Sequence, residues 1–323
     1  MFGYITLMEF QEKTVELVDE NIRVDKWFAR HYPSVSKALI QKYIRKKDIK
    51  LNHTKTEANC RIALGDILSF PVFAEKPDLP KKISDTQKKF IEEMVIYKDN
   101  WIIALNKPSG LAVQGGSKTK QHIDGLLDAL KFEKKEKPML VHRLDKDTSG
   151  VLLLARDKKT AATLTRLFAS RQVHKTYWAL VYGVPKEKEG IIDAPLRKIG
   201  SKGYERMGVD QENGLPAQTR YRVLEKLGKK MAWLELQPLT GRTHQLRAHC
   251  LLMHTPIIGD SKYCEENHLD FLSDEKTLHL HAYKIEFPHP VKGMLAICAK
   301  IPHHIQRSFS EAGFDEKNKG EKT

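Results

Sequence analysis

The chain has 323 residues, of which 41% are apolar and 30% are charged, a balance typical of a globular protein with room for two domains. Its 55 Lys and Arg residues outnumber 41 Asp and Glu residues, and the formal net charge is +14. This surplus favours a polyanionic partner, with nucleic acid ahead of an anionic membrane. No apolar stretch approaches the length of a membrane span and no secretory pattern opens the chain, so we expect a cytoplasmic protein.

The cysteines and histidines do not form a recognisable metal-binding pattern. The four cysteines, Cys60, Cys250, Cys264 and Cys298, are widely spaced, which indicates reduced thiols. No Cys-x-x-Cys pair is present among them, so we expect no zinc site.

The N-terminal part of the chain concentrates positive charge. Residues 24 to 50 carry eight Lys or Arg against two Asp, a local net charge of +6. The pattern predicts a helix over 24–31 and a second helix that begins after Ser34 or Ser36, either of which can serve as N-cap. Short strands are expected at 49–52 and 67–70.

The second helix separates apolar from basic side chains. One face is apolar and consists of Leu39, Ile40, Tyr43 and Ile44. The other faces carry the cations Lys37, Lys42, Arg45 and Lys46. Two interpretations of these cations remain open: a solvated helix surface, or a surface that follows a phosphate backbone.

The remaining elements follow from periodicity and turn residues. Residues 74 to 93 indicate an exposed linker with a short helix near its end. Further on, we expect helices at 122–130, 158–170 and just after Thr243, and strands at 95–97, 101–105, 151–155, 173–182, 191–196, 216–225, 231–237, 278–282 and 285–287. From about residue 304 the chain is polar, and we expect a mobile tail.

A dense polar segment, residues 142 to 149, precedes the apolar run 151–155. It contains the carboxylates of Asp145 and Asp147 together with an imidazole, a guanidinium and two hydroxyls. A loop fixed to a buried strand is a common position for a functional site. A solvated turn could have the same composition, so the residues alone leave both interpretations open.

A second polar segment, residues 238 to 249, holds Gly241 in a turn and Thr243 as a candidate N-cap of the following helix. Arg242 and Arg247 lie at the mouth and on one side of that helix. The segment lacks acids and thiols, so a metal site is not expected there.

Several motifs together resemble the RluA-type pseudouridine synthases. The segment His142-Arg-Leu-Asp145 resembles the family's catalytic signature, and Asn106-Lys-Pro-Ser-Gly110 with Val113, Gly115 and Gly116 resembles a second motif. Tyr177 stands in the family's Lys-x-Tyr-x-Ala pattern, although strand alternation alone would favour an ordinary core tyrosine. Residues 241 to 247, Gly-Arg-Thr-His-Gln-Leu-Arg, match a third motif. The closest likeness is to the RluC-like branch, which modifies 23S ribosomal RNA.

The resemblance implies a role for each matching residue. Asp145 would be the catalytic residue, and Arg247 would pair with it. Tyr177 would stack on the extruded uracil, Arg143 would fill the space that the base leaves, and Arg242 would touch phosphate. Asp147 has no catalytic counterpart in the family, so we interpret it as a loop or surface residue.

The implied reaction detaches uracil at N1–C1′ and rejoins it through C5. Nothing is oxidised and no group is imported, so no cofactor and no metal is expected. A carboxylate could attack the sugar as a nucleophile or take a proton from it as a base, and both roles stay open for Asp145.

The basic segment 22–73 resembles the S4-type RNA-binding domain. Lys47 and His53 occupy positions where that family often has glycine, which are positions that can need a positive φ. The expected fold is α+β: an S4-type domain at 22–73, a linker at 74–93, a catalytic domain at 94–303 on a mixed, mostly antiparallel sheet, and a polar tail at 304–323.

The expected partner is RNA, namely 23S ribosomal RNA or a large-subunit precursor. Two alternatives remain. The first is a non-catalytic RNA-binding assembly factor, motivated by the basic N-terminal part, and the second is the same chemistry on transfer RNA.

Overall fold

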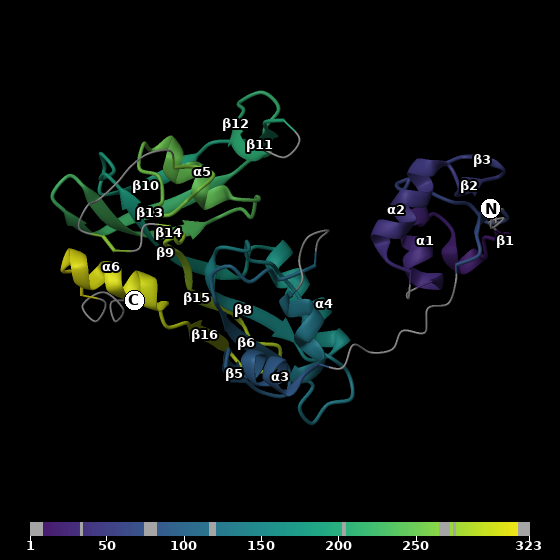
Figure 1. Ribbon diagram of the computed structural model, residues 1–323, viewed down its shortest axis with the longest axis horizontal. Coiled ribbons are helices and arrows are strands. Elements are labelled where there is room, and N and C mark those ends of the chain that lie inside the picture. The colour runs from purple at the N-terminus through teal and green to yellow at the C-terminus, as the bar shows by residue number, and fades with distance from the viewer. Residues whose placement is uncertain are drawn as a thin grey trace, which may run out of the picture. The chain divides into compact units, whose positions relative to one another are not determined.

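A computed structural model describes residues 9–32, 35–73, 83–115, 121–201, 205–264, 272–273 and 276–315. The chain forms two compact units, Met1–Lys82 and Ile83–Thr323 (Figure 1), and each is described by itself.

The first unit is a small four-stranded antiparallel sheet with two helices. Its sheet has the order β1-β4-β2-β3. The elements are β1 (Phe10–Thr14), the 3-10 turn η1 (Leu17–Asp19), α1 (Val24–His31), α2 (Lys37–Lys46), β2 (Lys50–Leu51), β3 (Thr54–Lys55) and β4 (Ile67–Pro71). Its core gathers aromatic side chains, because Trp27, Phe28 and Phe70 are buried and meet mainly edge to face. This unit therefore has a hydrophobic core of its own.

Helix α2 has the expected division of its faces. Ser36 is the N-cap, since its Oγ accepts a hydrogen bond from the Leu39 amide at 3.2 Å, whereas Ser34 lies outside the described residues. Ile40 and Ile44 are buried. The expected cations are exposed, namely Lys37, Lys42, Arg45 and Lys46.

Two turns of this unit adopt the left-handed conformation where the sequence suggested it. Lys47 has φ 68° and His53 has φ 61°, so these non-glycine residues adopt the positive φ that the two positions can need. Strand β1 lies before residue 22 and pairs with β4 along its whole length. Its weak sequence pattern has a physical reason, because an edge strand with mostly exposed side chains carries no apolar alternation.

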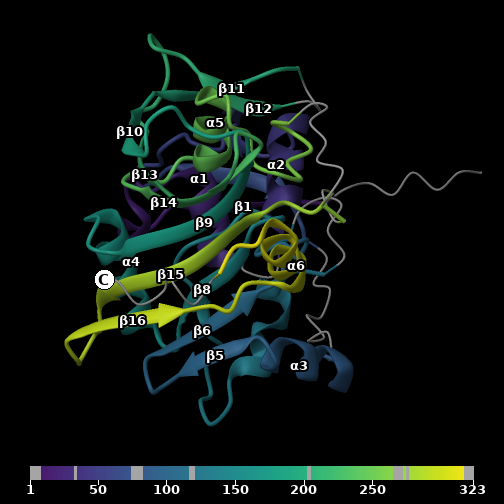
Figure 2. The ribbon, with the colours of Figure 1, turned by 90° about the vertical axis from the view of Figure 1, so that its left-hand side faces the viewer.

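The second unit is organised on a ten-stranded sheet. Its strand order is β10-β13-β14-β9-β15-β8-β6-β5, with β16 on β15 and β7 on β8. Figure 2 shows β9, β15, β8, β6 and β5 following one another across it. The strands are β5 (Val95–Lys98), β6 (Ile102–Lys107), β7 (Met139–Leu140), β8 (Ser149–Ala155), β9 (His174–Tyr182), β10 (Glu189–Asp193), β13 (Gln218–Leu227), β14 (Met231–Pro238), β15 (Leu280–Pro288) and β16 (Met294–Cys298), while β11 (Leu196–Ile199) and β12 (Arg206–Val209) form a separate hairpin. Among the strand pairs of the described residues only β15–β8 is parallel, so the mixed, mostly antiparallel sheet is confirmed.

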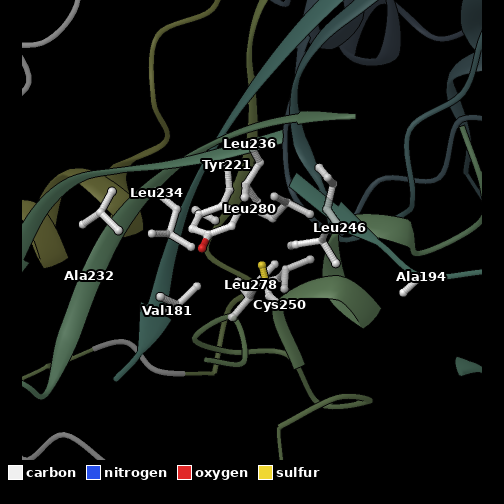
Figure 3. Packing of buried hydrophobic residues seen from close by; sticks show 14 residues of the cluster. Val181, Ala194, Tyr221, Ala232, Leu234, Leu236, Leu246, Cys250, Leu278 and Leu280 are labelled. Atoms are coloured by element: carbon white, nitrogen blue, oxygen red, sulfur yellow. The ribbon is translucent and has the colours of Figure 1, made fainter. Parts of the chain in front are cut away.

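Helices cover both faces of this sheet, and successive side chains of each strand point to one face and then the other. Along β14, Leu234 and Leu236 face one side, where α5 (Gln245–Leu252) packs through Leu246 and Cys250 (Figure 3). Trp233 faces the other side and contacts α6 (His303–Ala312). The remaining helical segments are α3 (Asp85–Glu92), the 3-10 helix η2 (Ile123–Leu130) and α4 (Lys158–Ala169). Within the described residues, no helix combines the length and the apolar character needed to cross a membrane.

Strand β8 can lie beside β15 only because residue 150 is glycine. Gly150 has φ +111°, and a Cβ atom there would lie 2.2 Å from the carbonyl oxygen of Ala282. Next to it, Ser149 Oγ is 2.9 Å from His281 Nδ1. The end of the polar loop is thus fixed to the centre of the sheet.

The expectation of a polar tail from residue 304 is wrong for its first part. Residues 303–312 form α6, in which Ile305 and Phe309 are buried and Phe309 lies 4.5 Å from the Trp233 ring. Most polar residues of the helix are exposed and conceal this narrow apolar stripe in the sequence, whereas Ser308 is buried and bonds to His279. Residues 316–323 lie outside the described residues.

Two local expectations also need correction. Helix α5 begins without the expected Thr243 cap, since His244 is the N-cap and adopts φ 49° and ψ 22°. The left-handed His244 carries the chain from the Gly241 turn into the helix and removes Thr243 from the capping position. The short helix expected near the end of segment 74–93 is present as α3, which a capping box of Ser84 and Gln87 begins, but the segment is not exposed throughout, because Ile91 is buried in the second unit. Residues 74–82 lie outside the described residues.

Candidate active site

A cavity of ≈ 1070 Å³ opens on the second unit where the two polar segments meet. Its lining comes from the turn 112–115, the loop 142–148, the C-terminal end of α4, the start of β9, the adjoining ends of β13 and β14, and residues 239–247. Asp145, Arg143, Tyr177, Arg242 and Arg247 all line it. Residues that are far apart in the sequence therefore converge on one site.

The first residue of the loop from His142 to Thr148 anchors it to strand β8. Nε2 of His142 accepts a hydrogen bond from the Leu153 amide of β8 at 2.8 Å, and the ring stacks on Phe168 at 4.7 Å. Burial, and secondarily the charge of Lys175, lowers the pKa of His142 to about 3. The imidazole is therefore an uncharged hydrogen-bond acceptor that fixes the start of the loop.

A buried lysine holds the other side of the same loop. Nζ of Lys107 donates to the carbonyl oxygens of Pro108, Leu111 and Lys146 at 2.8–2.9 Å. Burial lowers the pKa of Lys107 to about 7, and the carboxylates of Asp147 and Asp145 oppose that shift. Ser109 Oγ adds a bond to the Asp147 carbonyl at 2.6 Å. The Asn106–Gly110 motif thus supports the loop rather than reaching into the cavity.

These anchors leave the side chains of Arg143 and Asp145 directed to the cavity. Arg143 is exposed, and its guanidinium makes no ion pair with any residue in the described ranges. The Asp145 side chain is 32% exposed, and its nearest cationic or imidazole partner is His244, whose Nε2 is 3.9 Å from Oδ2. Asp147, two residues further on, does not line the cavity.

Tyr177 forms part of the cavity wall between two hydrophobic clusters. Burial, together with the charge of Asp145, raises the pKa of its hydroxyl above the ordinary range. Lys175 is on the same side of β9, two residues away, and burial lowers its pKa. An uncharged aromatic ring therefore lies next to the carboxylate, as a stacking platform requires.

Arg247 does not pair directly with Asp145, and that expectation is corrected. Its guanidinium binds Asp260 at both oxygens, Nε to Oδ2 at 2.7 Å and Nη2 to Oδ1 at 2.6 Å, and both side chains are buried. The bidentate geometry satisfies one edge of the guanidinium fully. Burial opposes the charged form of Arg247, but the hydrogen bonds and charge of Asp260 raise its pKa, and the charge of Asp145 adds a smaller contribution.

Arg242 lies at the cavity rim. Its Nε donates to the Pro216 carbonyl at 3.0 Å, and its Nη atoms make no hydrogen bond to the described residues. Among the other motif residues, Val113 is buried, Gly115 lines the cavity beside the His122 ring, and Gly116 lies outside the described residues. Within the described ranges, no group of three or more His, Cys, Asp or Glu side chains is arranged to hold a metal ion.

Sequence reasoning did not single out Lys107, His244 or Asp260. Lys107 and His244 lie inside the quoted motifs, but the sequence does not indicate that Lys107 supports the loop or that His244 faces Asp145. Asp260 lies 13 residues after Arg247, beyond the end of α5, and only the folded loop brings the two together. A buried ion pair of this kind leaves no sequence periodicity.

Comparisons with known proteins identify the family to which the chain is similar. A family model described as RNA pseudouridylate synthase matches residues 101–252, which include both polar segments. Ribosomal large subunit pseudouridine synthase C of Rickettsia typhi is 35% identical over 296 residues, which cover 89% of this chain and 96% of that protein. Mitochondrial RNA pseudouridine synthase 4 of Arabidopsis thaliana is 33% identical, with coverage of 88% and 78%.

Solved structures show the same likeness. The human RNA pseudouridylate synthase domain containing 4 superposes with a TM-score of 0.61 at 31% identity, over 71% of this chain and 96% of that chain. Together with the identity to curated relatives over nearly their whole length, this establishes that the chain belongs to the RluA-type family of RNA pseudouridine synthases.

Proposed function

We propose that this protein converts specific uridines of large-subunit ribosomal RNA to pseudouridine, with Asp145 as the catalytic carboxylate. The observation that carries the proposal is the Asp145 side chain in the ≈ 1070 Å³ cavity, beside Tyr177 and with Arg143 at the opening. The relatives named ribosomal large subunit pseudouridine synthase C supply the class of RNA.

The geometry suits a carboxylate that acts on a sugar. Asp145 is partly exposed and close to an imidazole, and it forms no ion pair with the arginine of α5. One of its oxygens can therefore reach C1′ as a nucleophile or a sugar proton as a base. The N1–C1′ bond would break, the uracil would turn within the cavity, and C5 would bond to C1′; C5 would then lose its proton and N1 would gain one, so that the product is an isomer of uridine.

The target base must leave its stack before this chemistry, at a cost of a few kcal/mol. Tyr177 would support the extruded uracil face to face, since base–aromatic stacking contributes about 1–3 kcal/mol. Arg143, exposed and without an ion-pair partner among the described residues, would enter the gap left in the RNA. Arg242 would contact a neighbouring phosphate through its remaining N–H groups.

The first unit would add affinity for RNA that does not depend on sequence. Its helix α2 presents Lys37, Lys42, Arg45 and Lys46 to solvent, and none of them forms an ion pair within the described ranges. We interpret this unit as the S4-type domain expected at 22–73. The protein would act in the cytoplasm, on 23S ribosomal RNA or a large-subunit precursor.

Pseudouridine mapping of large-subunit RNA tests the proposal directly. Cells that lack the gene should lose specific pseudouridines, and re-expression of the wild type should restore them. Asp145→Asn should fail to restore them while it still binds RNA within a few-fold of the wild type. Asp147→Asn is the matched control, because the same charge is removed two residues away and outside the cavity.

Other outcomes point to the alternatives. Restoration by Asp145→Asn would refute the catalytic assignment. Unchanged ribosomal RNA together with lost pseudouridines in transfer RNA would move the substrate to transfer RNA. No change in either RNA would favour a non-catalytic assembly factor.

A further inference from the structure

His244 occupies the one place in the described cavity wall from which an imidazole nitrogen faces Asp145. Its Nε2 lies 3.9 Å from Oδ2 of Asp145, too far for a hydrogen bond but near enough for one after a small closure. The Asp145 carboxylate accepts no hydrogen bond from the residues that the structure describes. Catalytic hydrogen bonds are often long before substrate binds and shorten in the complex.

A chain of hydrogen bonds defines which nitrogen of His244 carries the proton. The hydroxyl of Tyr263 accepts the amide N–H of Met207 at 2.7 Å and lies 3.1 Å from Nδ1 of His244. Tyr263 is only 2% exposed, and its hydroxyl hydrogen finds no other acceptor in the described part of the chain. A buried hydroxyl hydrogen without an acceptor is costly, so it points to Nδ1. Nδ1 is therefore the acceptor, and the single proton of the neutral ring is on Nε2, toward Asp145.

The support of Tyr263 is itself rigid. Its ring stacks under the Arg247 guanidinium at 5.1 Å, and Arg247 is held in the bidentate pair with Asp260. Asp260 in turn accepts the amide N–H groups of Lys262 and Tyr263. The motif arginine thus acts on Asp145 through an ordered sequence of contacts that ends at His244.

The local backbone is also shaped for this orientation. His244 has φ 49° and ψ 22°, a left-handed conformation that is uncommon for a residue other than Gly, Asn or Asp. Such a conformation costs on the order of 1 kcal/mol and persists where the surroundings require it. The charged or titratable groups that face the ring are Asp145, Arg247, Lys262, Asp260 and Tyr263.

We propose that His244, with its proton on Nε2, is a positioning residue that donates a hydrogen bond to Oδ2 of Asp145 when RNA closes the site. This inference rests on the proposed role of Asp145. The bond would hold the carboxylate ionised and turn its other oxygen, Oδ1, to the uridine. No proton is transferred in this step, because the imidazole stays neutral and remains a donor throughout.

The first test reads the tautomer in the unmodified protein. The full-length chain is labelled with 15N-histidine, and the His244 signals are assigned by their loss in His244→Gln. The expected spectrum at neutral pH is that of a neutral ring protonated at Nε2. A ring protonated at Nδ1, or a cationic ring, would overturn the proposal whether or not any variant is active.

The second test measures turnover on an RNA substrate. His244→Ala should lower kcat by about 10- to 100-fold with little change in KM, as expected for the loss of a hydrogen bond to a charged group. His244→Gln places an amide N–H near the position of Nε2 and should recover most of that loss. Tyr263→Phe keeps the ring on Arg247 but removes the hydroxyl, and should lower kcat by less and mix the two tautomers.

His254→Ala is the matched control. His254 shares the left-handed backbone, with φ 59°, but is exposed at the far end of α5 and does not line the cavity. A kcat of His244→Ala within two-fold of the wild type would refute the proposal, provided that Asp145→Asn is inactive. Full activity of Asp145→Asn would instead refute the proposed function, so the two failures are distinguishable.

Discussion

At the scale of single residues, the site depends on buried polar groups that are fully paired. Lys107 is completely buried and still donates to three carbonyl oxygens, one of them in the loop that carries Asp145. Arg247 and Asp260 form a buried pair behind the cavity. In both places a buried side chain stabilises a loop, and the sequence of that loop indicates only that it is polar.

Lys107→Met tests the first of these groups through pH. Burial places the folded-state pKa of Lys107 at about 7, below the ordinary 10.5 of the unfolded chain. Between these values the unfolded state binds a proton that the folded state has lost, so the wild type gains stability as pH rises. Relative to Lys107→Met, its free energy of unfolding should increase by up to about 1.4 kcal/mol per pH unit from pH 7 to 10.

Urea unfolding of both proteins across that pH range measures this difference. A pair of parallel curves would contradict it and assign Lys107 an ordinary pKa. Near pH 7 and below, the ammonium form supplies all three donors, and Lys107→Met should lower activity because the Lys146 carbonyl loses its contact.

Asp260→Asn tests the second group. It removes one charge of a buried pair and leaves the Arg247 charge uncompensated, so the free energy of unfolding should fall by about 3–5 kcal/mol. Glu235→Gln is the control, since its cross-strand pair with Arg222 at 3.1 Å has one partner 43% exposed. That change should cost no more than about 1 kcal/mol, and equal losses in the two variants would refute the argument.

At the scale of elements, the loop owes its position to the junction of β8 and β15. Gly150 combines a positive φ with a close approach to the Ala282 carbonyl. Gly150→Ala should therefore prevent normal folding or lower the free energy of unfolding by more than about 3 kcal/mol. Gly228→Ala is the matched control, because Gly228 has φ +55° but open space around its Cα, so only the backbone strain of about 1 kcal/mol applies. Thermal unfolding compares the two, and similar losses would show that the contact with Ala282 is unimportant.

The sequence predicted the elements that have a local apolar pattern. It did not predict an element whose formation depends on packing against distant residues. The apolar run 151–155 and the alternation around Tyr177 are local signals, and both strands are present. Helix α6 was missed because its buried residues, such as Ile305 and Phe309, are separated by polar letters. Their burial depends on Trp233, more than 70 residues earlier, and no local pattern contains that information.

The candidate site was predictable to a similar extent. The motifs brought Asp145, Tyr177, Arg242 and Arg247 to one cavity, as the resemblance implied. They did not show that Arg247 binds Asp260 or that His244 faces Asp145, because such partners depend on how the chain turns after α5. Sequence motifs identify which side chains meet, whereas hydrogen-bond geometry decides which of them pair.

At the scale of the whole molecule, the net charge of +14 is distributed unevenly. The exposed cations of α2 belong to the first unit, whereas the candidate active site lies entirely within the second. If α2 contacts phosphate, its charges should control RNA affinity while the chemistry at Asp145 proceeds unchanged once RNA is bound. The salt dependence of RNA affinity measures the first effect, and kcat at saturating RNA measures the second.

A variant with Lys37, Lys42, Arg45 and Lys46 all changed to Gln tests this division. Its log affinity for a ribosomal RNA fragment should depend less steeply on log salt, with a slope reduced by about 3, while kcat at saturating RNA stays within two-fold. The control changes Lys188, Lys226, Lys229 and Lys230 to Gln. Lys226, Lys229 and Lys230 lie at the end of the β13–β14 hairpin, and Lys188 directly precedes β10. All four are exposed and do not line the cavity, so net charge falls equally. A control that reduces the slope as much as the α2 variant would mean that total charge, and not the surface of α2, attracts the RNA.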